Sequence, residues 1–208
     1  MYLAIEGVIG VGKTTLARLL QGTYSARLCL EVFEENPFLS DFYADRVRYA
    51  FQTQIFFLLS RYHQQRREVA EALRNGHAIT DYTFAKDALF ARLNLRGDEL
   101  EMYYRVHEAL AEKVPAPDLI VYLQASTEAL MQRIALRDRP YERLMERAYI
   151  EELVQAYDSF FAGFAESQVL TIGTDGLNFV ANPEHLGEVR RRINSALKIG
   201  PYQPELPL

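Results

Sequence analysis

Residues 7–15 read Gly7-Val8-Ile9-Gly10-Val11-Gly12-Lys13-Thr14-Thr15, an uninterrupted G-x-x-x-x-G-K-T run near the start of the 208-residue sequence. An apolar segment precedes the run and a helix-forming segment follows it. This strand–loop–helix context is what a phosphate-binding loop requires. The glycines let backbone N–H groups converge on phosphate, Lys13 reaches the outer phosphates, and the Thr14 hydroxyl can hold Mg²⁺. The run therefore predicts a nucleoside triphosphate site formed by Gly7, Gly10, Gly12, Lys13, Thr14 and Thr15.

Short apolar strands alternate with longer amphipathic helices along the rest of the sequence. The predicted strands cover 2–6, 28–33, 78–81, 119–123 and 169–172, and the predicted helices cover 13–20, 46–74, 85–93, 99–113, 127–136, 144–166 and 184–198. This alternation is typical of an α/β protein. We expect a P-loop three-layer fold with a parallel sheet of about five strands, in which ligands bind at the carboxyl ends of the strands. A single domain is expected over 1–200, followed by a Pro-rich tail over 201–208.

Bulk composition narrows the classes of partner. The net charge of −5 argues against broad nucleic-acid binding, which needs a basic surface. The longest strongly apolar run, 55–59, is too short to cross a membrane. Cys29 is the only cysteine, which excludes an internal disulfide and fits a reducing, cytoplasmic compartment.

Candidate carboxylates follow the second and third predicted strands. Glu31, Glu34 and Glu35 compete for one role, because any of them could accept the proton of an attacking hydroxyl beside the P-loop. Glu31 lies within an apolar run and is favoured, whereas Glu34 and Glu35 also fit a solvated acidic loop. Asp81 ends the third strand, as a Walker B acid near Mg²⁺ would, and it could also cap a helix.

Four arginines gather between 133 and 143. Arg133 and Arg137 are four residues apart and share a helix face, while Pro140 leaves Arg139 on a loop. Such a segment, at about 137–146, can act as a lid that brings positive charge over phosphates and expels water. The alternative to a lid role is a solvated position at a helix end. That alternative fits Arg143 best and fits Arg133 and Arg137 less well.

An aromatic helix carries two polar residues on one face. Gln54 and Arg61 are seven residues apart, about two helical turns. A glutamine amide can pair with a base edge that presents one donor and one acceptor, as adenine does. The surrounding apolar residues fit a nucleoside pocket, although ordinary core packing is the alternative.

Together with the P-loop, four further motifs resemble the deoxyribonucleoside kinase family, in its bacterial deoxyadenosine/deoxyguanosine kinase branch. The resemblance extends from the P-loop to about residue 157. The four motifs are Glu31-x-x-x-x-Asn36-Pro37-Phe38-Leu39, Phe51-Gln52-Thr53-Gln54 through Ser60-Arg61, Asp81-x-x-x-x-Lys86-Asp87-x-x-Phe90-Ala91, and Tyr122-Leu123-Gln124-Ala125 followed by Arg133-Ile134-x-x-Arg137-x-Arg139.

The resemblance implies a role for each matching residue. Glu31 would be the general base toward the 5′-hydroxyl, Gln54 would pair with the nucleobase, and Phe90 would stack on it. The remaining implied roles are base choice for Arg61 and Asp87, the sugar 3′-hydroxyl for Tyr43 and Glu142, the lid for Arg133, Arg137 and Arg139, and Mg²⁺ for Asp81. The resemblance also implies ATP as the donor and a homodimer formed through the long helices.

One position departs from the family pattern. The family often has an arginine directly after the acid that Asp81 matches, and here Tyr82 follows. Because a tyrosine carries no positive charge, either a lid arginine replaces that contact or the contact is dispensable. The spacing also leaves open whether Lys86 or Asp87 faces the base.

The sequence thus predicts an ATP-dependent kinase that phosphorylates the 5′-hydroxyl of a deoxyribonucleoside, with a purine base favoured. A nucleoside monophosphate kinase, similar to thymidylate kinase, is the nearest alternative. It would need further cationic groups for the substrate phosphate. A non-catalytic nucleotide-binding regulator is the alternative from another class.

Overall fold

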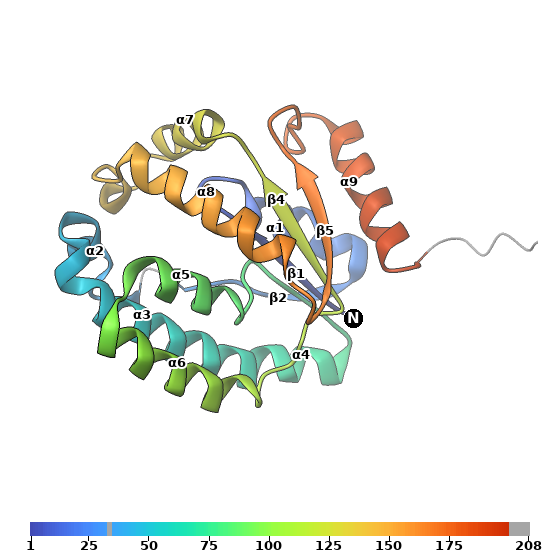
Figure 1. Ribbon diagram of the computed structural model, residues 1–208. Helices are drawn as coiled ribbons and strands as arrows, with labels where there is room; N and C mark the ends of the chain where they lie inside the picture. Colours follow the sequence, from blue (N-terminus) through green and yellow to red (C-terminus); the bar gives the residue numbers. More distant parts are fainter. Residues whose placement is uncertain (33–34, 200–208) are drawn as a thin grey trace, which may run out of the picture.

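A parallel sheet forms the centre of the computed structural model, which describes residues 1–32 and 35–199. Its strands are β1 (Tyr2–Gly7), β2 (Ala26–Cys29), β3 (His77–Thr80), β4 (Leu119–Gln124) and β5 (Gln168–Gly173). The order in the five-stranded sheet is β2-β3-β1-β4-β5, and every neighbouring pair is parallel (Figure 1). The α/β class and the sheet of five strands are therefore confirmed.

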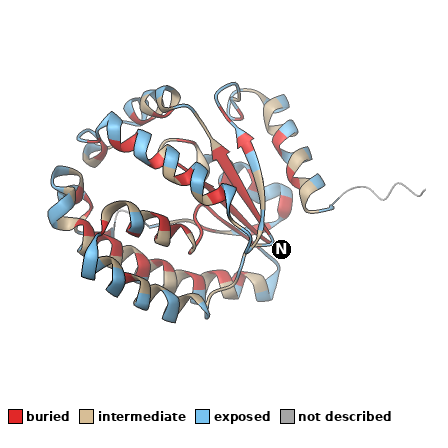
Figure 2. Ribbon diagram, in the orientation of Figure 1, coloured by how far each residue is buried: buried red, intermediate tan, exposed pale blue. Residues whose placement is uncertain are grey.

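β1 occupies the middle of this sheet, hydrogen-bonded to β3 on one side and to β4 on the other. Every residue of β1 is buried, which is typical of a central parallel strand covered on both faces (Figure 2). The P-loop therefore leaves the sheet between the carboxyl ends of β3 and β4.

Helices cover both faces of the sheet (Figure 1). α1 (Lys13–Tyr24) and α9 (Pro183–Ala196) lie on one side. The other side carries the larger group, which is α3 (Arg46–Gln64), α5 (Lys86–Asn94), α6 (Gly97–Ala111) and α8 (Arg147–Ala162). α2 (Leu39–Ala44) precedes α3, and α7 (Thr127–Arg137) follows β4. None of the helices in the described part of the chain combines the length and apolarity that a bilayer crossing requires.

The second strand is shorter than the predicted 28–33. β2 ends at Cys29, which pairs with Thr80, the last residue of β3, so the β2–β3 ladder ends there. The N–H of Glu31 donates instead to Asp81 Oδ1, at 2.8 Å. Phe33 and the candidate acid Glu34 lie outside the described residues.

The single helix predicted over 46–74 is three segments. A π-helical turn (Gln65–Val69) separates α3 from α4 (Ala70–Asn75). Two successive glutamines reach the sheet there. Gln65 Nε2 donates to the Tyr2 hydroxyl at 2.8 Å, and Gln64 Nε2 donates to the Leu30 carbonyl at 2.8 Å. The wider turn is the kind of irregularity that a 3.6-residue pattern does not reveal.

Other helix ends also differ from the prediction. The helix predicted over 144–166 is confined to α8, and α1 continues past the predicted residue 20 to Tyr24. Two short helices were not predicted, α2 and the 3₁₀ turn Pro140–Glu142, because six and three residues are too few for a periodic pattern. The Pro-rich tail predicted over 201–208 lies outside the described residues.

Candidate active site

The P-loop backbone needs glycine where it turns out of β1. Gly7 has φ +145°, and a Cβ added there would collide with the carbonyl oxygen of Leu123 on β4. Gly12 caps α1 with φ +105°, a region that L side chains rarely adopt, and Phe179 lies against it. The loop therefore passes close to β4 before its N–H groups lead into the helix, as a phosphate cradle requires.

Lys13 curls back over this loop. Its Nζ donates to the carbonyl oxygens of Gly7 at 2.7 Å and Val8 at 3.2 Å. Burial, followed by the nearby positive charge of Lys86, lowers the pKa of Lys13 to about 8. An anion placed beside this ammonium would be favoured, because it would offset both effects.

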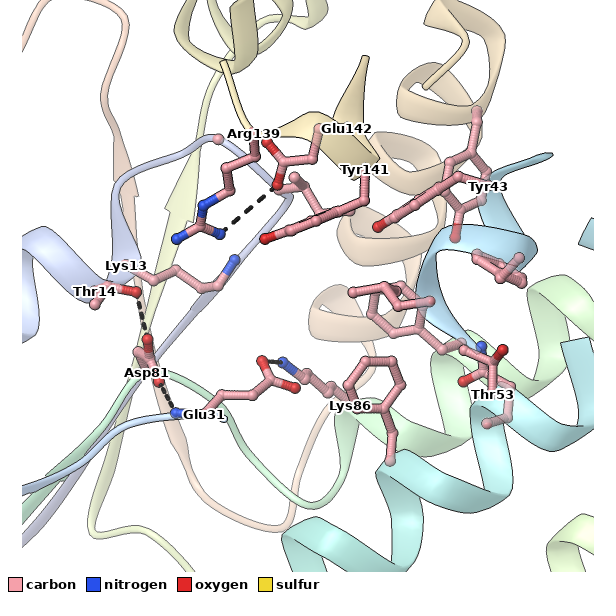
Figure 3. A pocket seen from close by; sticks show the side chains of 18 of the residues that line it. Lys13, Thr14, Glu31, Tyr43, Thr53, Asp81, Lys86, Arg139, Tyr141 and Glu142 are labelled. Atoms are coloured by element: carbon pink, nitrogen blue, oxygen red, sulfur yellow. Dashed lines mark hydrogen bonds and ion pairs between the residues drawn. The ribbon is translucent and has the colours of Figure 1, made fainter. Parts of the chain in front are cut away.

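Asp81 joins the P-loop to the segment that follows β2. The Thr14 hydroxyl donates to Asp81 Oδ2, while Asp81 Oδ1 accepts the Glu31 N–H (Figure 3). The Asp81 side chain is buried. This one carboxylate therefore fixes the phosphate loop and the candidate base relative to each other.

The Glu31 carboxylate is held between two cations. Arg61 Nε donates to Oε1 at 2.8 Å, and Lys86 Nζ donates to Oε2 at 2.9 Å. Arg61 also makes an ion pair with Asp87, which is fully buried. Burial raises the pKa of Glu31, but Arg61 and Lys86 outweigh burial and lower it to about 2. Glu31 is therefore a carboxylate at neutral pH.

One pocket combines this carboxylate with the P-loop lysine and an aromatic wall. Lys13 and Glu31 reach into the same space (Figure 3). Gln54 and Phe90 line it from α3 and α5, and the Phe90 ring lies edge-on to Tyr157, with centroids 6.1 Å apart. Gln54 is buried, so its amide lies at the wall of this pocket and away from bulk solvent.

The segment between α7 and α8 closes the far side of the pocket. Glu142 is buried and accepts from Arg137, at 2.6 Å from Nη2 and 3.1 Å from Nε, with Arg139 Nη1 at 3.8 Å (Figure 3). Tyr141 stacks on Tyr43 of α2, with ring centroids 6.3 Å apart and planes 12° from parallel. The Tyr141–Tyr43 stack therefore ties the predicted lid segment to α2, whereas Glu142 links residues within that segment.

A second hollow lies on the other side of the P-loop. It is bordered by residues 10–12, Thr15, Arg133, Arg137 and residues 175–180. Arg133 donates to Thr174 Oγ1 at 3.0 Å and to the Thr174 carbonyl at 2.8 Å. Arg137 borders both hollows, whereas Arg133 borders only this one. The P-loop therefore borders two hollows, with Lys13 and Thr14 at the first and Gly12 and Thr15 at the second.

The structure separates the predicted residues into groups. The first pocket brings together Gly10, Lys13, Thr14, Glu31, Tyr43, Gln54, Arg61, Asp81, Phe90, Arg137, Arg139 and Glu142. Asp87 lies behind Arg61 instead, and Arg143 pairs with Asp138 at the surface. The roles given to these residues stay predictions. Between Lys86 and Asp87, it is Lys86 that lines the pocket.

Several lining residues were not singled out from the sequence. They include Phe42, Tyr141, Tyr149 and Tyr157, whereas Thr53 was named only within a motif and Lys86 only as the alternative to Asp87. Tyr141 lies between Arg139 and Glu142, so the predicted lid segment already included it and could have indicated a place at the pocket. Tyr149 and Tyr157 are on α8, whose long amphipathic pattern gave no sign of which end would meet a ligand.

Comparisons with known proteins agree over most of the chain. A family model described as deoxynucleoside kinase matches residues 3–198. A deoxyguanosine kinase of Bacillus subtilis (strain 168) is 33% identical over 201 residues, covering 94% of this chain and 97% of the relative. A deoxyadenosine kinase of Dictyostelium discoideum is 34% identical over 193 residues, covering 90% of this chain and 77% of the relative. The solved structure of deoxyadenosine kinase from M. mycoides with bound dCTP has a TM-score of 0.79 at 25% identity, covering 94% of this chain and 100% of that one.

Proposed function

The chain belongs to the deoxynucleoside kinase family, and from that premise we propose that it transfers the γ-phosphoryl group of ATP to the 5′-hydroxyl of a purine deoxyribonucleoside. The observation that carries the proposal is the single pocket containing both the P-loop Lys13 and the Glu31 carboxylate. A phosphoryl donor and a hydroxyl acceptor would meet there.

The proposed mechanism asks little covalent chemistry of the protein. Glu31 orients the 5′-hydroxyl and accepts its proton as the oxygen attacks phosphorus. Lys13, Arg137 and Arg139 would stabilise the negative charge of the transferring group. Positioning and electrostatics supply most of the rate in such reactions. We assign Arg133 to the donor side, because it borders the second hollow.

Mg²⁺ is the expected companion of ATP, and the residues present fit it. The Thr14 hydroxyl and the Asp81 carboxylate are hard oxygen donors that already touch each other. Magnesium in kinases is held by one or two such groups together with phosphates and waters. When bound, the ion would neutralise charge on the β- and γ-phosphates.

Purine preference is supported by the relatives and by the base end of the pocket. The two relatives described above are named for deoxyguanosine and deoxyadenosine. Gln54 offers a donor and an acceptor, which match the edge of adenine. Phe90 lies in the same pocket and supplies a face for stacking.

An initial-rate panel tests the substrate directly. Deoxyadenosine, deoxyguanosine, deoxycytidine and thymidine would each be supplied with ATP and Mg²⁺, alongside deoxyadenosine monophosphate. We expect turnover of a purine deoxynucleoside at the highest kcat/KM. Turnover of the monophosphate alone would instead identify a nucleoside monophosphate kinase, and a pyrimidine with the highest kcat/KM would contradict the purine preference.

Substitution of the carboxylate tests the mechanism. Glu31→Gln keeps the shape of the side chain but cannot accept the proton, so kcat should fall by about 10²–10⁴-fold. Glu35→Gln removes the exposed competitor and should leave kcat close to that of the wild type. If Glu35→Gln lost activity while Glu31→Gln kept it, the base would have to be reassigned.

A cytoplasmic homodimer completes the proposal. Two large apolar side chains, Leu59 on α3 and Met102 on α6, are 41% and 51% exposed on helices that pack side by side. They could be covered by a second copy, and light scattering of the purified protein would give the mass. Cys29 is buried and its pKa is raised to about 11 by burial, which suits a structural thiol in a reducing compartment.

A further inference from the structure

A buried ammonium lies beside the candidate base, where the residue after Asp81 cannot provide a charge. Tyr82 is fully buried and neutral. Lys86, the first residue of α5, extends over the Tyr82 ring with its Nζ 5.8 Å from the ring centroid. The same Nζ donates to Glu31 Oε2 at 2.9 Å (Figure 3). Lys86 therefore supplies the positive charge at this point of the pocket.

The backbone that carries Lys86 is fixed. Glu6 of β1 accepts from the Thr83 N–H at 2.5 Å and from the Thr83 hydroxyl at 3.0 Å. The Thr83 hydroxyl oxygen in turn accepts the Lys86 N–H at 3.3 Å. The start of α5 is thus tied to the strand that leads into the P-loop, while the long side chain of Lys86 keeps its own rotatable bonds.

The two cations on Glu31 are not equivalent. Arg61 pairs with Glu31 and with the fully buried Asp87 at once, so moving it would leave a buried carboxylate without its partner. In the part of the chain that the structure describes, Glu31 is the one acceptor found for Lys86 Nζ. Lys86 is therefore the partner that can leave Glu31 at lower cost.

Proton transfer from the 5′-hydroxyl to Glu31 is easier once Lys86 has moved away from the carboxylate. A carboxylate that accepts hydrogen bonds from two cations is a poor proton acceptor, and it becomes a better one when one of the two cations leaves. The position of Lys13 indicates where the Lys86 ammonium would move. Lys86 and the P-loop Lys13 line the same pocket, in which a transferring phosphoryl group would lie.

We propose that Lys86 is the mobile cation of the reaction, which neutralises Glu31 in the ligand-free protein and passes to the transferring γ-phosphoryl group in the ternary complex. This inference rests on the proposed kinase function and assigns a catalytic group within it.

The step balances as follows in atoms and charge. The 5′-O–H bond breaks and its proton goes to Glu31, while the oxygen's electron pair forms the new O–P bond. The bond between the γ-phosphorus and its bridging oxygen breaks, and its electron pair leaves with ADP. Lys86 takes no part in the proton count, since it moves only its positive charge from the carboxylate to the phosphoryl oxygens.

The experiment compares Lys86→Met, Lys86→Gln and Lys86→Arg with the wild type. Lys113→Met, at an exposed site distant from the pocket, is the matched control. Measurements are kcat, KM for each substrate, the Kd of ATP, and the Kd of ADP with aluminium fluoride and deoxynucleoside, which imitates the transition state. Melting temperatures identify variants that fail to fold. Lys86→Gln keeps a hydrogen-bond donor toward Glu31, so it remains informative if Lys86→Met is unstable.

Both neutral variants should lower kcat by about 100-fold or more and weaken the transition-state mimic by a similar factor. The Kd of ATP should change by less than about threefold, because the contact is absent with ATP alone, forms in the ternary complex and strengthens as the phosphoryl group transfers. Lys86→Arg should recover part of kcat.

Two outcomes would overturn the inference. Neutral variants with wild-type kcat would show that no charge at residue 86 is needed. Equal weakening of ATP binding and of mimic binding would also contradict the inference. It would show that Lys86 stabilises the bound substrate and the transition state to the same extent. Both presuppose an active wild type. If the wild type phosphorylates no deoxynucleoside, the proposed function itself fails, and the two failures are thereby distinguished.

Discussion

Lys13 carries a lowered pKa in the group that should bind the outer phosphates. Its ordinary pKa of 10.5 falls to about 8 through burial and the charge of Lys86. The lysine is charged below that pH and loses its charge as the pH rises through it. At physiological pH most Lys13 side chains of the ligand-free protein are therefore charged, but a small rise in pH removes much of that charge.

The affinity of the free protein for ATP should accordingly decline above about pH 8. Each pH unit beyond the pKa removes up to about tenfold of the charged form and of the affinity that depends on it. Isothermal titration with ATP and Mg²⁺ between pH 6.5 and 9.5 gives the curve. Deoxynucleoside binding without ATP serves as the control and should not follow the same limb. A Kd for ATP that stays constant to pH 9.5 would contradict the prediction.

Residue types near the P-loop could be predicted, but their partners could not. The sequence placed Glu31 and Asp81 at strand ends, and the carboxyl-end rule brought them to one edge of the sheet. Helical spacing grouped Arg133 with Arg137, yet Arg133 is bound to Thr174, whose position depends on a turn 41 residues away. Whether Lys86 or Asp87 faces the pocket depended on a 100° step around α5, which spacing from Asp81 could not determine.

At the scale of elements, α1 ends on a residue in a conformation that glycine adopts more easily. Ser25 has φ +47° and ψ +41°, and its N–H donates to the carbonyl oxygens of Gln21 and Gly22. This geometry is the left-handed cap that closes many helices. Ser25 is exposed, so its side chain contributes little packing to offset the strain.

Ser25→Gly should therefore stabilise the protein by roughly 0.5–1 kcal/mol, since the relief of strain exceeds the entropy gained by the unfolded chain. The melting temperature should rise by about 2–4 °C. Arg18→Gly, an exposed position inside the same helix, is the control and should cost roughly 0.5–1 kcal/mol. Calorimetry of both variants measures the difference. Destabilisation by both would show that the cap is not strained.

Long elements were predicted better than their ends. All five strands were expected within a few residues of where they lie, because apolar runs between helical patterns are a strong signal. β2 stopped early because β3, the strand that it pairs with among the described residues, stops at Thr80. The π-helical turn after α3 depends on where Gln64 and Gln65 find acceptors, which are contacts distant in sequence.

At the scale of the molecule, burial falls from the middle of the sheet to its edge. Leu3 on β1 is completely buried, whereas Leu170 on β5 is only half-buried. Leu3→Ala should cost about 2–5 kcal/mol of unfolding free energy, because a large side chain is removed from a closed core. Leu170→Ala should cost less than about half of that. Urea unfolding of both variants makes the comparison, and equal losses would contradict the ranking.

The central position of β1 has a consequence for synthesis. β1 emerges from the ribosome before the other four strands of the described sheet, and β3 and β4, with which it pairs, end about 70 and 120 residues later. At roughly 5–20 residues per second, the nascent chain carries an unpaired apolar strand for roughly 6 to 22 s before β4 has been made. A slow tract of codons between β3 and β4 would lengthen that interval and raise the demand for chaperones. The strand that leads into the phosphate-binding loop is thus the one that waits longest for its partner while the enzyme is being made.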